Sequence, residues 1–167
     1  RSSKATGQIV VHSKDRMVRQ AVSDLQGLMA ETTGAELSVV DADGIEADRP
    51  AIVVGACPAA EAAGLTPEEL PIEGFSIKTA AGRVFIVGRD GPGTTWGVNE
   101  FLERYVGVRW YWPEYRNKVG TAGTSIVKKA DLIIAPVHLT DAPFFRKRHR
   151  WPSGGPRIGK AQMKEND

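Results

Sequence analysis

Seven glutamates in the middle of the chain are the side chains best suited to acid–base chemistry. Most glycoside hydrolases cleave sugars with two carboxyl groups held about 5 to 10 Å apart. No spacing among these glutamates predicts such a pair, and carboxylates are seldom buried alone, so solvated helix faces and loops are the expected positions. The residues are Glu61, Glu68, Glu69, Glu73, Glu100, Glu103 and Glu114. The sequence therefore predicts no catalytic residue in this chain, and no His or Cys cluster has the spacing of metal ligands.

A glycine-rich loop at residues 88–93 (GRDGPG) is the second candidate for chemistry. It lies between a β-prone segment and a helix, and N–H groups at the start of a helix can hold an anion such as phosphate. Gly88 and Gly93 match the outer glycines of a phosphate-binding loop, but Thr94 takes the place of the essential lysine. Without that charge, a tight turn and close packing of helix on sheet explain the glycines better. The loop is predicted to be structural.

Aromatic residues gather at residues 110–115 (WYWPEY), with Trp96 in the preceding helix. Aromatic faces can stack on sugars, which would suit a carbohydrate-binding surface. On a strand, Trp110 and Trp112 would share one face while Tyr111 points to the other. Because aromatic side chains bury large areas, a role in the core and at an interface is favoured. We predict that Trp110 and Trp112 lie at a domain interface.

The only strongly basic stretch is residues 146–151 (RKRHRW). A nucleic-acid-binding protein would use such charges to displace counterions from phosphates. The whole chain, however, has 22 Lys and Arg against 20 Asp and Glu, a formal net charge of +2. One short run in a nearly neutral chain favours no nucleic-acid partner. If the run instead begins a barrel strand, its charges would point into a sugar-binding mouth.

Composition bounds the remaining classes. The chain has 167 residues, of which 41% are hydrophobic and 25% charged, enough for one sizeable core. Cys57 is the single cysteine, so no internal disulfide can form. No apolar run approaches the roughly 20 residues of a membrane helix. We expect no membrane partner and no cofactor.

Two amphipathic helices and several short β-prone segments must position these residues. The first helix follows a capping stretch that ends at Asp15, and it should end near Gly34. The second would be capped by Thr94 or Thr95 and end at Gly107. One or two short helices are expected between residues 58 and 71. The expected strands are residues 8–12, 37–40, 51–54, 75–79, 83–87, 108–112, 125–128 and 132–135.

This order of elements favours an α+β fold over a doubly wound nucleotide-binding fold. A hairpin is expected around residues 80–82, where Gly82 supplies a positive φ. Only two strong helices are present, which suits a sheet covered mainly on one face. We predict a mixed, mostly antiparallel sheet with two main helices packed on one face. Beyond Trp151 the sequence has no apolar face that could pack, and a loose tail is expected.

One longer pattern resembles a known family. The helix motif GTTWGVNEFLE (93–103) runs on into GVRWYWP (107–113), and shorter matches are ETTG (31–34), IVVG (52–55), GFSI (74–77) and VFIVG (84–88). Together, over residues 8–151, they resemble the N-terminal domain of α-glucuronidases and related bacterial glycoside hydrolases. That domain is itself similar to the one preceding the barrel in β-N-acetylhexosaminidases. The resemblance thus implies a domain of this β-N-acetylhexosaminidase domain-2-like type.

The resemblance implies a division of labour. Residues 1–142 would form a non-catalytic accessory domain, and residues 143–167, which begin with PFFR, would be the start of a truncated catalytic barrel or a disordered tail. The catalytic carboxylates would belong to that barrel, with Arg146, His149 and Trp151 as substrate-binding residues. The substrate would be a plant or microbial polysaccharide, glucuronosyl-decorated xylan among the options, and the location secreted or periplasmic. The alternatives are an autonomous carbohydrate-binding module and nucleic-acid binding through residues 146–150.

Overall fold

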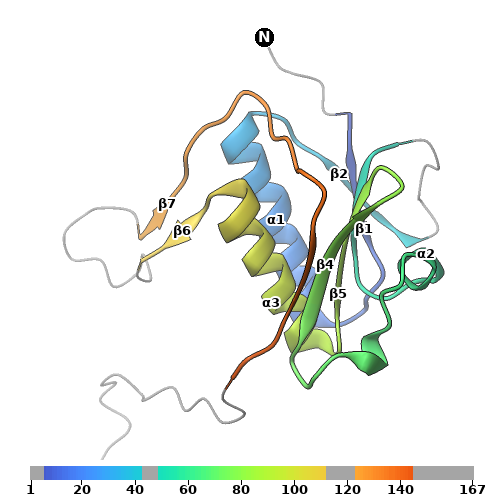
Figure 1. The fold of residues 1–167 in the computed structure, drawn as a ribbon. Helices are drawn as coiled ribbons and strands as arrows, with labels where there is room; N and C mark the ends of the chain where they lie inside the picture. The colour runs from blue at the N-terminus through green and yellow to red at the C-terminus, as the bar shows by residue number, and fades with distance from the viewer. Residues whose placement is uncertain (1–5, 43–48, 112–122, 145–167) are drawn as a thin grey trace, which may run out of the picture.

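The computed structural model describes residues 6–42, 49–111 and 123–144 (Figure 1). Its main feature is a six-stranded sheet with the order β2-β1-β3-β5-β4-β8. The strands are β1 (Gln8–Val11), β2 (Ser38–Asp41), β3 (Ala51–Val54), β4 (Phe75–Ala80), β5 (Arg83–Gly88) and β8 (His138–Asp141). The helices are α1 (Arg16–Thr33), α2 (Pro58–Ala62) and α3 (Gly91–Phe101).

The sheet is mixed, and most of its pairings are parallel. Strand β1 pairs in parallel with β2 and β3, and β3 pairs in parallel with β5, whereas β4 is antiparallel to both β5 and β8. The prediction of an α+β fold with a mixed sheet and two main helices on one face is confirmed, but the expectation that antiparallel pairs dominate is wrong. The reason is that β1, β3 and much of β5 are buried on both faces, as parallel strands usually are.

Helix α1 has the ends that its sequence indicates. The Asp15 carboxylate accepts hydrogen bonds from the N–H groups of Met17 at 2.7 Å and Val18 at 3.2 Å, which satisfies two donors of the first turn. At the other end Gly34 has φ 73° and its N–H donates to the Ala30 carbonyl. The helix is therefore capped at both ends by its own sequence, as predicted.

Helix α3 begins earlier than the sequence suggested. Its N-cap is Asp90, not Thr94 or Thr95, and Pro92 stands in the first turn, where the fixed φ of proline suits a helix. The threonine hydroxyls instead donate back to the carbonyls of Asp90 and Gly91. A π-helical turn, η3 (Leu102–Val106), continues the helix to Gly107, whose φ of 94° ends it as expected.

Two layers of apolar side chains hold the sheet. On one face the core lies between the strands and helices α1 and α3, and on the other a smaller core lies under α2 (Figure 1). Alternate residues of β1 supply both layers, since Ile9 and Val11 belong to the first and Val10 to the second. Gly97 brings α3 close to the sheet, because a Cβ there would lie 2.9 Å from Ile86 Cγ2.

The last part of the described chain departs from the sequence expectation. Residues 132–135 form no strand, and of residues 125–128 only Ser125 lies in one, in β7 (Thr124–Ser125), which pairs with β6 (Arg109–Trp110). The unexpected strand is β8, which joins the sheet edge beside β4. There Ser76 Oγ lies 3.0 Å from the carbonyl oxygen of Leu139. The apolar character of residues 132–135 led to a wrong strand prediction, because Ile133 is in fact 88% exposed. Strand β8 was not predicted because it is held by backbone pairing with β4.

Candidate functional site

The start of α3 has no room for a phosphate, in agreement with the structural interpretation of its glycine loop. Asp90 Oδ1 accepts from the N–H of Gly93 at 2.7 Å, so a carboxylate of the protein already occupies the helix N-terminus. Asp90 Oδ2 accepts from the N–H of Glu73 at 3.1 Å, which ties the loop before β4 to the same carboxylate. A Cβ on residue 88 would lie 2.0 Å from the Thr94 nitrogen. These glycines therefore serve close packing.

An open groove lies between α1 and α3, and it is also bordered by Phe75 of β4 and by residues 141–143 at the end of β8. Its volume is about 1110 Å³. We call it the α1–α3 groove and define it by its lining residues: Ser23, Asp24, Gly27, Leu28, Glu31, Phe75, Trp96, Asn99, Glu100, Glu103, Trp110, Asp141, Ala142 and Pro143. Helix packing creates it, because the apolar stripes of both helices face the sheet and leave polar residues outside.

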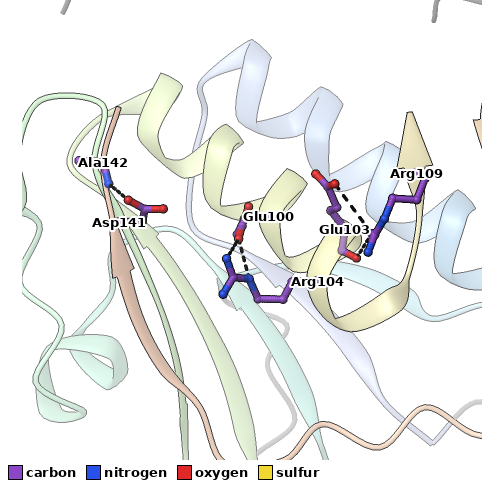
Figure 2. A network of polar contacts seen from close by, with 6 residues as sticks. All are labelled: Glu100, Glu103, Arg104, Arg109, Asp141 and Ala142. Atoms are coloured by element: carbon purple, nitrogen blue, oxygen red, sulfur yellow. Dashed lines mark hydrogen bonds and ion pairs between the residues drawn. The ribbon is translucent and has the colours of Figure 1, made fainter. Parts of the chain in front are cut away.

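The α1–α3 groove is acidic. Five of its lining residues are carboxylates, and none is Lys, Arg or His. Figure 2 shows part of the set: Glu100 accepts from Arg104, with Nη2 2.6 Å from Oε1, and Glu103 lies 3.9 Å from Arg109 Nη1. The other three are Asp24, Glu31 and Asp141, for which the described residues supply no ion pair. The groove thus carries a net negative charge.

Two tryptophans lie along this groove. Trp96 of α3 is 39% exposed, and its indole N–H donates to Glu73 Oε2 at 3.3 Å. Trp110 of β6 is 44% exposed. Partly exposed aromatic side chains are frequent at interfaces, where they bury a large area and keep a polar edge. The structure brings Trp110 to the groove, and its role at a domain interface stays a prediction.

Several residues singled out in the sequence lie outside the described part of the chain. These are Trp112, Arg146, His149 and Trp151. Of the glutamates considered for acid–base chemistry, Glu100 and Glu103 reach the groove, and Glu114 is outside the described ranges. Within those ranges no group of three or more His, Cys, Asp and Glu side chains is arranged to hold a metal ion.

Sequence reasoning missed the grouping of Asp24, Glu31 and Asp141. Asp24 and Glu31 are seven residues apart on one helix, a spacing that repeats every two turns, so their shared face could have been noticed. Asp141 lines the same groove because it stands at the end of β8, a strand that the sequence did not predict. No helix in the described ranges has both the length and the apolar character to cross a membrane.

Comparison with known proteins identifies the fold. No family model and no curated protein match the sequence. Among solved structures, the Streptomyces plicatus N-acetyl-β-hexosaminidase matches 85% of this chain at 18% identity with a TM-score of 0.52, and the match covers 23% of that enzyme. The GH20 β-N-acetylhexosaminidase from Streptomyces coelicolor A3(2) gives 85% coverage, 17% identity, TM-score 0.52 and 23% of its own chain.

A third structure with this fold is a family GH115 4-O-methyl-α-glucuronidase with specificity for decorated arabinogalactans. It matches 85% of this chain at 15% identity with a TM-score of 0.52, over 18% of its own length. The chain therefore spans about a fifth of the length of the structures it resembles. At such identities the likeness shows the fold alone. The fold of this chain is one that occurs as part of larger glycoside hydrolases.

Proposed function

We propose that this chain is the non-catalytic, N-terminal α+β domain of a larger glycoside hydrolase of the α-glucuronidase type, and that it supports a catalytic barrel that follows it. Residues 1–142 are the accessory domain in this proposal, and residues 143–167 begin the barrel. The shared fold with parts of larger glycoside hydrolases supports the general assignment. The α-glucuronidase type rests on the sequence motifs that end in GVRWYWP.

The observation that carries the proposal is the position of the α1–α3 groove beside the end of β8. Asp141, Ala142 and Pro143 line the groove, so the polypeptide leaves the sheet on the helix side (Figure 1). Residue 144 therefore lies next to a helix face that the described residues leave open. Partly exposed Trp96 and Trp110 lie on that face, as expected of a surface that packs on a neighbouring module.

In this proposal the substrate is bound by the longer enzyme, which includes the barrel. It is a plant or microbial polysaccharide, with Arg146, His149 and Trp151 contacting the sugar from the first part of the barrel. Such an enzyme would act outside the cytoplasm, in the periplasm or as a secreted protein. The acidic α1–α3 groove does not favour a nucleic-acid partner, because phosphates are bound by Lys and Arg.

The test compares the chain with the longer enzyme. Both are assayed on aryl-glycosides and on decorated xylan oligosaccharides, together with the longer enzyme lacking residues 1–142. We expect no turnover by the chain, turnover by the enzyme, and reduced thermal stability of the shortened form. Clear turnover by the chain alone would overturn the proposal.

A second candidate function is an autonomous carbohydrate-binding module. Trp96, Trp110 and Asn99 share the α1–α3 groove, and an aromatic face beside amide and carboxylate groups is suited to a sugar. Calorimetry against soluble polysaccharides separates the two functions. Saturable heat with the isolated chain favours the binding module, and its loss in Trp110→Ala would assign it to the groove.

A further inference from the structure

The α1–α3 groove has unusual space along α1. Gly27 lies in the middle of this 18-residue helix, where glycine is less favourable than alanine. A Cβ at Gly27 would meet nothing within 4 Å, so no contact in the described structure requires a glycine there. Ser23, one turn before it, is also small and exposed. This surface of α1 would let another segment approach the helix backbone closely.

The charge in the groove is complementary to the segment that follows it. The carboxylates of Asp24, Glu31 and Asp141 line the same groove and have no ion-pair partner among the described residues, and unpaired negative charges favour a cationic partner. Three residues after Pro143, which lines the groove, the sequence reads RKRHR (146–150), the most basic stretch of the chain. The negatively charged groove and the positively charged run therefore lie only a few residues apart along the chain.

The tether is long enough for contact. Extended chain spans at most about 3.5 Å per residue, so residue 148 can reach up to about 25 Å from Asp141. Asp24 and Glu31 are seven residues apart, or about 10 Å along the helix axis. A short tether holds the run at an effective concentration in the millimolar range. With the run held there, three exposed ion pairs, each weak by itself, would together favour a partly populated bound state.

We propose that the basic run at residues 146–150 docks in the α1–α3 groove, where Lys147, Arg148 and Arg150 pair with Asp24, Glu31 and Asp141. These three cations are the ones that the proposed sugar contacts leave free. The inference rests on the proposed function in one respect: the docked run would hold the start of the barrel against the helix face. The contact itself lies within the 167-residue chain and can be tested there.

The experiment measures proximity by paramagnetic NMR on the full 167-residue chain. A spin label is attached to Ser153→Cys in a Cys57→Ser background, and peak intensities of the Gly27 and Asn99 amides are compared with those of a diamagnetic label. We expect both amides to lose at least half of their intensity at low salt. Most of it should return at about 0.5 M salt, since the Debye length then falls below about 5 Å.

Variants separate docking from nonspecific proximity. Lys147→Glu, Arg148→Glu and Arg150→Glu together should restore the Gly27 and Asn99 intensities, and so should Glu31→Lys. The matched control is Glu61→Lys on exposed α2, which is on the other face of the sheet and should leave the broadening unchanged. Gly27→Gln improves helix propensity while filling the groove, so it should abolish broadening in a folded protein.

The outcomes are distinct from those of the functional test. Absent broadening, or broadening that neither salt nor Glu31→Lys changes, overturns the docking. If xylan oligosaccharides remove the broadening while the charge variants do not change it, the docking is also overturned and the groove is assigned to sugar. If the longer enzyme needs residues 1–142 for stability while the broadening is absent, the proposed function stands without this contact.

Discussion

Gly88 and Thr94 are packed backbone against backbone where β5 meets α3. A Cβ on residue 88 would lie 2.0 Å from the Thr94 nitrogen and 2.4 Å from the Gly93 carbonyl carbon. No flexible side chain is available there to move aside. The contact fixes the position of the start of α3 against the end of β5, and α3 forms one wall of the α1–α3 groove.

Gly88→Ala is expected to destabilise the chain by about 3 kcal/mol, at the upper end for overpacking, because main-chain atoms must shift. Urea denaturation followed by circular dichroism measures the change. Gly82→Ala is the control. A Cβ added at this position would meet nothing within 4 Å, so only the φ of 71° opposes the change, and the expected loss of stability is about 1 kcal/mol. Equal losses in the two variants would contradict the packing argument.

Asp90 is expected to act as the internal anion of the α3 N-terminus. Asp90→Ala removes the acceptor for the N–H groups of Gly93 and Glu73 and should cost about 2 kcal/mol, whereas Asp90→Asn keeps one oxygen and should cost about half as much. Thermal unfolding with and without 10 mM phosphate tests the same point. Phosphate should leave the wild-type midpoint unchanged, and stabilisation of the wild type by phosphate would show an open anion site.

Local signals allowed much of the fold to be predicted. Asp15 and Gly34 mark the ends of α1 because each satisfies backbone groups within its own turn. The hairpin of β4 and β5 follows from its turn residues, and Ala81 and Gly82 both have positive φ. Such features depend on a few neighbouring residues, so the sequence alone contains them.

Long-range pairing was harder to predict. Strand β8 is mostly exposed and polar (HLTD), and what fixes it is the row of backbone groups on β4, a neighbour some 60 residues away. The parallel pairs had a visible signal, since the continuous apolar runs IVV of β1 and AIVV of β3 indicate strands buried on both faces. The α1–α3 groove combines residues from α1, α3, η3, β4, β6 and the end of β8, so no single motif reveals it.

Cys57 stands at the N-cap of α2 without making a side-chain cap. Its extended φ of −159° and the following Pro58 suit a capping serine, whose oxygen can accept from the N–H groups of the first turn. Cys57→Ser should be more stable than Cys57→Ala by about 1 kcal/mol. Urea midpoints of the two variants measure the difference. Identical midpoints would mean that the cost of burying the serine hydroxyl offsets the stability gained from the cap.

Trp110 separates a role in folding from a role at a domain interface. The side chain is 44% exposed on the two-stranded β6–β7 sheet, away from the main core, so Trp110→Ala should cost the 167-residue chain less than about 1 kcal/mol. In the longer enzyme the same change should lower the midpoint of thermal unfolding by several degrees, because a well-packed interfacial tryptophan contributes about 2 kcal/mol or more. Trp110→Phe, which keeps most of the apolar area, is the matched control and should lower the midpoint less.

Two outcomes would contradict this role. A large loss of stability in the isolated chain would assign Trp110 to the domain's own core, and an unchanged midpoint in the longer enzyme would remove it from the interface.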